Sequence, residues 1–150
     1  MRKFLGSLVG VIVAIAVQTA GDLLGNKLYP PHITDMWNRS QVAEALAMRP
    51  TAALWISVAG YFAGALIGGW IGKKIARSPV GAWVPAGLLA LMALAVGWGF
   101  PGAAWAMVAT VAAPLIGGLL ANHLAGAVPA AEPAAVDAGP ADAVEVADEG

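Results

Sequence analysis

The stretch that decides the fold is "GYFAGALIGGWIG", residues 60–72, in which glycine recurs at every fourth position. Glycine destabilises a water-exposed helix by about 1 kcal/mol relative to alanine, so a helical row of glycines needs a compensating contact. In a lipid bilayer that contact is close packing, because apolar side chains gain little by leaving the lipid tails for one another. The stretch therefore predicts a membrane-spanning helix that packs through its glycines: Gly60, Gly64, Gly68 and Gly72.

The amino-acid composition also indicates that lipid surrounds most of the chain. Apolar residues make up 59% of the 150 residues and charged residues 11%, whereas globular domains average about 45–50% and about 25%. From Ser78 to Ala131 the chain carries no Asp, Glu, Lys or Arg, and this run has room for two bilayer crossings of about 20 residues each. We expect an all-α integral membrane protein, because helices satisfy their own backbone hydrogen bonds in lipid.

Four apolar segments have the length of membrane spans. We expect residues 1–125 to form a four-span transmembrane domain, a membrane four-helix bundle, with spans at about 4–24, 52–72, 80–100 and 102–120. The third span is the most aliphatic, and we expect it to face lipid most. Residues 126–150 are acidic and rich in Ala and Pro, which predicts a disordered tail. The first span also has features of a signal peptide, and cleavage near Thr19-Ala20-Gly21 would leave three spans.

The basic residues predict the orientation. With four spans, five of the eight fall on one side of the membrane and three on the other. Because positive charge collects on the cytoplasmic side, we expect a multi-pass membrane protein with both termini cytoplasmic. Tryptophans at both expected interfaces agree with these spans. The basic set on the cytoplasmic side is Arg2, Lys3, Lys73, Lys74 and Arg77, and the outer set is Lys27, Arg39 and Arg49.

The outer loop, residues 25–51, is the one substantial connection. We expect a short amphipathic helix from Asn38 or Ser40 through Met48, lying on the outer membrane surface. His32 and Asp35 share this loop, but two potential ligands do not make a metal site.

A second row of small residues occurs in the first span, where Gly6, Gly10 and Ala14 precede Gln18 and Asp22 at the same spacing. The two spans run antiparallel, so we expect Gly6 and Gly10 to face the level of Gly72 and Gly68, and Gln18 to lie near Ser57 and Gly60. Two alternatives stay open: another subunit could occupy the groove, or an Ala- and Gly-rich composition could scatter these residues without a packing role.

Gln18 and Asp22 are the main polar candidates of the first span, with Gln18 expected inside the hydrocarbon and Asp22 one turn further out, near the interface. We expect Gln18 to form interhelical hydrogen bonds, with Thr19, Ser57 or Thr110 as its partner. A proton- or cation-coupled path along Gln18 and Asp22 is the alternative. The sequence contains no catalytic motif, metal pattern or cofactor motif, and its basic residues are too few for nucleic-acid binding.

These features predict a small non-enzymatic membrane protein that serves as a structural or accessory subunit. Its expected partners are membrane lipids and either further copies of the chain or a larger membrane complex. The alternative is a small oligomeric transporter or channel-like protein using Gln18 and Asp22. A membrane enzyme with its site in the outer loop is a third and weaker alternative.

Three segments resemble a widespread group of short four-span bacterial membrane proteins without an assigned activity: "LYPPHITDM" after the first span, "GALIGGWIGKKIA" ending the second, and "FPGAAW…GGLLANHLA" in the fourth. The resemblance covers roughly residues 5–125 and implies the four-span topology, with no activity to carry over. Many members carry a histidine near the position of Ala59 and Gly60, which this chain lacks. Small four-span drug exporters are less similar, because they need a carboxylate where this chain has Ala14.

Overall fold

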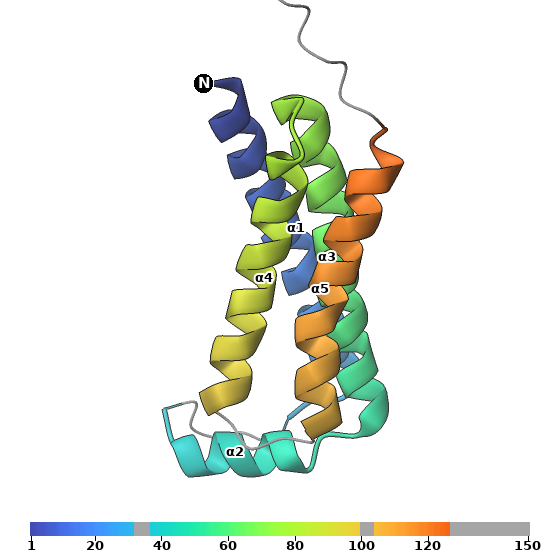
Figure 1. Cartoon of the computed structure of the whole chain (residues 1–150). Helices are drawn as coiled ribbons and strands as arrows, with labels where there is room; N and C mark the ends of the chain where they lie inside the picture. The colour runs from blue at the N-terminus through green and yellow to red at the C-terminus, as the bar shows by residue number, and fades with distance from the viewer. Residues whose placement is uncertain (32–36, 100–103, 127–150) are drawn as a thin grey trace, which may run out of the picture.

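The computed structural model describes residues 1–31, 37–99 and 104–126. These residues form five helices: α1 (Arg2–Leu28), α2 (Arg39–Ala47), α3 (Thr51–Ala76), α4 (Val80–Gly99) and α5 (Ala104–Leu124). The four long helices run side by side, and α2 lies across one end of the bundle (Figure 1). The described part of the chain contains no strand, so the predicted all-α bundle is confirmed.

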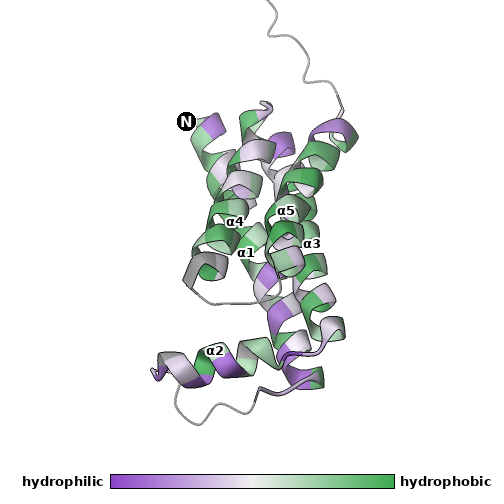
Figure 2. Cartoon of the chain, turned by 60° about the horizontal axis from the view of Figure 1, so that its bottom comes forward, coloured by the Kyte–Doolittle hydropathy of each residue, from purple (hydrophilic) through white to green (hydrophobic). Residues whose placement is uncertain are grey.

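The N-terminus and the end of α5 lie at the same end of the bundle, which we call the terminal end, and α2 lies at the opposite end, which we call the α2 end (Figure 1). All four long helices have the length and hydropathy of membrane spans. Hydrophobic residues cover most of their length, whereas hydrophilic residues gather near the two ends and on α2 (Figure 2). The fold is therefore that of a small multi-pass membrane protein.

The helix ends differ slightly from the predicted spans. Helix α1 continues to Leu28, so the expected loop 25–51 begins with a further helical turn. Helix α3 continues to Ala76 and ends where Arg77 adopts a left-handed conformation with φ 48°. The peptide N–H of Arg77 donates to the carbonyl of Lys73 at 2.8 Å, which closes the last turn of α3. Helix α2 falls within the predicted short helix.

Helix α3 is the central element, because it packs against α1, α4 and α5. The residues buried beneath these contacts are mainly small. The hydrophobic core contains one leucine, one tyrosine and one valine among alanines: Ala14, Val58, Tyr61, Ala65, Ala86, Leu89, Ala93 and Ala113. Such small side chains let neighbouring helices approach closely, as membrane helices commonly do.

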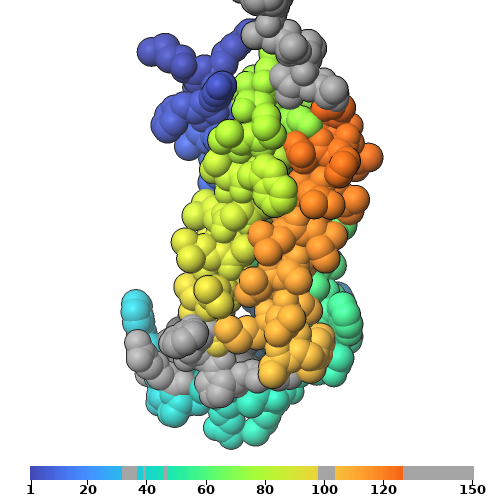
Figure 3. Space-filling view, viewed as in Figure 1, coloured from blue at the N-terminus to red at the C-terminus, as the bar shows by residue number. Residues whose placement is uncertain are grey.

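The expectation that the third span faces lipid most is wrong. In the apolar segment of α4, 33% of the residues are buried, compared with 22% in α1 and 28% in α5. The reason is that α4 presents one face of small residues and Leu89 to the other helices, and Ala82, Ala86 and Leu89 are fully buried. Helices α4 and α5 also pack side by side along the bundle (Figure 3).

Two predicted features lie outside the described residues. The acidic tail expected at 126–150 is described only at Gly126, and the loop residues His32 and Asp35 belong to the undescribed range 32–36. In the described ranges, no three His, Cys, Asp or Glu side chains come together as potential metal ligands.

Candidate functional site

The predicted small residues of α1 and α3 lie directly against one another. A Cβ added at Gly64 would lie 2.6 Å from the carbonyl oxygen of Ala14, and one added at Gly10 would lie 2.8 Å from that of Gly68. A Cβ at Gly68 would collide with the Gly10 carbonyl and with the Ala14 side chain. We call this contact the α1–α3 seam; the residues forming it are Gly6, Gly10, Ala14, Gly60, Gly64, Gly68 and Gly72.

The register of the seam is close to the predicted one. Gly10 lies against Gly68 and Gly72, and a Cβ built on Gly72 would lie 3.1 Å from the carbonyl oxygen of Gly6, as predicted; Gly6 also lies against Ala76. At the other end of the seam, a Cβ at Gly60 would lie 3.5 Å from the carbonyl oxygen of Gln18. The Cα–H groups of the glycines thus point at carbonyl oxygens of the facing helix, an arrangement that recurs at helix–helix interfaces.

Helix α4 joins the seam through two residues that sequence reasoning missed. Pro85 has no N–H, so the carbonyl of Gly81 loses its usual helical donor. That carbonyl lies against Gly72, where a Cβ would collide with it, and the Pro85 ring lies 3.0 Å from a Cβ built on Gly10. The four-residue spacing of Gly81 and Pro85 is the signal that could have indicated this contact.

A polar cluster follows the seam toward the α2 end. The side-chain amide of Gln18 donates to Oδ2 of Asp22, and Oγ of Ser57 donates to Oδ1 of Asp22 at 3.1 Å. Gln18 is 6% exposed, so its amide orients Asp22 from within the bundle. The expected interhelical bond of Gln18 is therefore wrong, because its amide bonds to Asp22 one turn along the same helix. Of the expected partners, Ser57 donates to Asp22 and Thr110 donates to the Ala106 carbonyl of its own helix at 2.7 Å. The carboxylate of Asp22 is therefore the centre of the cluster.

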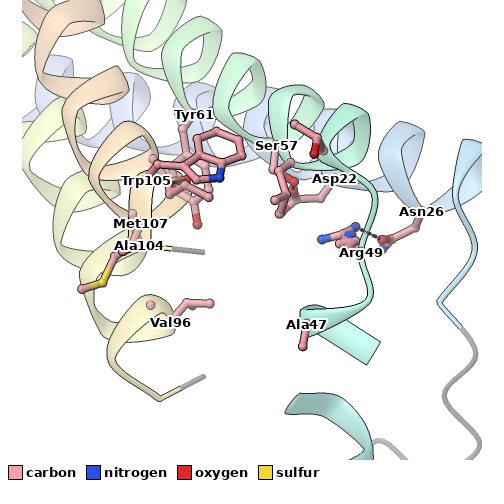
Figure 4. A pocket seen from close by; sticks show the side chains of 16 residues that line it. Asp22, Asn26, Ala47, Arg49, Ser57, Tyr61, Val96, Ala104, Trp105 and Met107 are labelled. Atoms are coloured by element: carbon pink, nitrogen blue, oxygen red, sulfur yellow. Dashed lines mark hydrogen bonds between the residues drawn. The ribbon is translucent and has the colours of Figure 1, made fainter. Parts of the chain in front are cut away.

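Asp22 and Ser57 line a cavity of about 660 Å³ at the α2 end of the bundle. Tyr61 and Trp105 lie together on one side of it, and Arg49 and Asn26 lie on another (Figure 4). Nη2 of Arg49 donates to Oδ1 of Asn26, while its Nε is buried and has no hydrogen-bond partner within the described residues. Val96 and Met107 add apolar surface to the wall. The cavity thus combines one acid, one base and two aromatic side chains.

The terminal end of the bundle has a different polar contact. Lys73 is 6% exposed, and its ammonium donates to the carbonyl oxygen of Asn122 in the last turn of α5. The peptide N–H groups of Ala125 and Gly126 donate to the carbonyl oxygens of Ala121 and His123, respectively. Neither N–H therefore donates to the carbonyl oxygen of Asn122. Lys73, which sequence reasoning treated only as a cytoplasmic charge, therefore caps α5.

The tryptophans divide between the two ends of the bundle. The rings of Trp55 and Trp105 meet at the α2 end with centroids 5.4 Å apart and an interplanar angle of 36°, which joins the first turns of α3 and α5. At the other end, the ammonium of Lys74 lies 4.2 Å from the ring centroid of Trp70.

Comparisons with protein-family models, with curated proteins and with solved structures find no match for this chain. The resemblance to short four-span bacterial proteins therefore stays a prediction. The class of the protein follows from its own fold: a small multi-pass α-helical membrane protein with a cavity at one end that contains an acidic and a basic side chain.

Proposed function

We propose that this chain is a small non-enzymatic protein of the bacterial inner membrane, with both termini cytoplasmic, that acts as an accessory subunit and presents a solute-binding cavity to the outside. The bacterial four-span group that it resembles has the same topology. The observation that carries the proposal is the contrast between the two ends of the bundle, one hollow and polar and the other closely packed.

The hollow end supports binding. A cavity of about 660 Å³ falls within the range of about 300–1,000 Å³ that ligand pockets occupy. A carboxylate at membrane depth is expensive and usually marks a functional site. Asp22 lies toward the α2 end of the apolar helix α1, where it is partly buried and lines the cavity, so the same reasoning favours a functional role.

The packed end supports an accessory role over a conduit. Around Gly10, Gly68, Gly72 and Gly81, three helices touch backbone to backbone. A solute entering from the α2 end would meet this contact before it reached the terminal end. A sensory or accessory subunit needs to bind a solute without letting it cross the membrane.

Cysteine labelling tests the orientation and the access to the cavity. The chain has no cysteine, so a single introduced cysteine is the only thiol that the reagent can label. We introduce one at a time: Thr51→Cys or Ala47→Cys in the cavity wall, and Pro79→Cys at the terminal end. We expect a membrane-impermeant maleimide to label the first two in intact spheroplasts, and Pro79→Cys only after permeabilisation. The opposite pattern would reverse the orientation, and unlabelled cavity positions would contradict an outward-facing cavity.

A transporter is the second candidate, favoured by the hydrogen bond between Gln18 and Asp22 within the apolar helix α1. Transport would require the packed end to open. Flux of protons or cations into vesicles containing the purified protein tests it, with Asp22→Asn and Gln18→Leu as variants. Absent flux, or flux that survives both changes, excludes a path along these residues.

Isolation from native membranes without any stable partner would count against the accessory role.

A further inference from the structure

The cavity at the α2 end holds two opposite charges on neighbouring walls, because Arg49 bonds to Asn26, one helical turn after Asp22 on α1. Within the described ranges, the hydrogen-bond donors to Asp22 are both neutral, namely the Gln18 amide and the Ser57 hydroxyl. They fix the direction of the carboxylate without compensating its charge. Because Asp22 is partly exposed and lines the cavity, the carboxylate is available to a cationic group of a ligand.

Arg49 provides the positive charge. Its Nη2 is engaged by Asn26, and its Nε is buried without a partner within the described residues. The side chain also lines the cavity, on the wall away from Tyr61 and Trp105 (Figure 4). The bond to Asn26 is to a neutral oxygen, so it orients the guanidinium and leaves its charge for an anionic group.

The third wall is aromatic and apolar. Tyr61 is 7% exposed and Trp105 is 41% exposed, and both line the cavity with Val96 and Met107. Aromatic faces attract ammonium groups, and the aliphatic residues suit a short hydrocarbon group. A ligand that fits all three walls carries both charges and an apolar part.

We propose that this cavity binds a zwitterionic small molecule, with its ammonium at Asp22, its carboxylate or phosphate at Arg49 and its apolar part against Trp105 and Val96. The inference deepens the proposed function and rests on it. A cation alone would leave Arg49 uncompensated, and an anion alone would leave Asp22 uncompensated; a charge removed from water without a partner is strongly unfavourable. A guanidinium suits either anionic group, because its fork of N–H donors matches both geometries.

Three matched probes test the need for both charges. The purified full chain in an uncharged maltoside detergent is titrated by calorimetry with leucine, with 3-methylbutylamine, which lacks the carboxylate, and with 4-methylpentanoate, which lacks the amine. A short-chain phosphatidylethanolamine and a phosphatidylglycerol of equal chain length form a second arm. Binding of leucine or phosphatidylethanolamine, at least about tenfold tighter than their single-charge counterparts, supports the proposal.

The leucine titrations and the phospholipid titrations distinguish a soluble ligand from a lipid headgroup. Leucine binding identifies a soluble amino-acid-like ligand, and phosphatidylethanolamine binding identifies a lipid headgroup; either supports the shared chemistry. The proposal is overturned if neither zwitterion binds, or if a single-charge probe binds as tightly. Such a failure leaves the cysteine-labelling test of an outward-facing cavity unaffected, so the two ideas fail separately.

Variants that remove single charges test whether Asp22 and Arg49 bind the zwitterion. Asp22→Asn and Arg49→Gln keep the side-chain shape and remove one charge each, and each should weaken binding of the zwitterion at least about tenfold. Glu44→Gln and Lys27→Gln remove the same charges from exposed side chains that do not line this cavity, and they should bind as the wild type does. Unchanged helical circular dichroism shows that each variant is folded. Full binding by both Asp22→Asn and Arg49→Gln would contradict the assignment.

Discussion

At Gly68 the absence of a side chain decides whether α1 and α3 can touch. A methyl group there would collide with the carbonyl of Gly10 and with the Ala14 side chain. Gly87, in contrast, has nothing within 4 Å of its added Cβ. The same residue type thus has two roles in this bundle, and only the surroundings distinguish them.

This contrast gives a matched test of packing at the residue scale. Gly68→Ala should lower the free energy of unfolding by about 1–3 kcal/mol, because the added methyl overpacks the seam despite its better helix propensity. Gly87→Ala should leave stability within about 0.5 kcal/mol or raise it slightly. Unfolding in mixed micelles, followed by circular dichroism, measures both. A Gly68→Ala protein as stable as Gly87→Ala would show that the seam has room for a side chain.

At the residue scale, contacts could be predicted from the sequence where the spacing of residues along a helix determined them. The four-residue spacing placed Gly10 opposite Gly68, and it placed Gln18 near Gly60. It did not identify Asp22 as the acceptor of both Gln18 and Ser57. The Gln18–Asp22 bond lies within α1 at a four-residue spacing that the sequence already shows, whereas the rotation of α1 and α3 about their axes decides that Ser57 meets Asp22. Arg49 was likewise read only as a charge, although its packing onto Asn26 places it at the cavity.

At the scale of elements, α3 organises the bundle because small residues occur on several of its faces. Gly64 and Gly68 meet α1, while Gly72 meets α4 through the Gly81 carbonyl. On its remaining side, α5 approaches through Gly117, whose added Cβ would lie 2.6 Å from the Phe62 carbonyl oxygen. Span lengths could be predicted from hydropathy, but the burial of α4 could not, because an aliphatic composition suits lipid and protein neighbours equally.

Lys73 links two of these elements, and its replacement tests that link. Lys73→Met keeps much of the apolar stem but leaves the Asn122 carbonyl without its donor, which should lower stability by about 1 kcal/mol. Amide hydrogen exchange should quicken in the last turn of α5. Lys74→Met is the control, because Lys74 is exposed and contacts Trp70. Equal exchange in α5 for the two variants would mean that Lys73 does not hold this helix end.

At the scale of the whole molecule, the bundle is closely packed toward the terminal end and hollow toward the α2 end. Small residues close the first region, while the second is widened by larger side chains such as Tyr61, Trp105 and Met107 around the cavity. The topology could be predicted from charge and hydropathy. The cavity could not, because its walls come from segments distant in the sequence, which share no local pattern.

The central claim is that α1 and α3 meet backbone to backbone, with lipid as the surrounding solvent. Solid-state NMR of the protein in lipid bilayers, with ¹³C at the Cα of glycine and the Cβ of alanine, tests it most directly. We predict a cross-peak between the Ala14 Cβ and the Gly68 Cα that disappears in Ala14→Gly, because these groups are in contact across the seam. If that cross-peak is missing while contacts within each helix are observed, the two helices do not pack as described.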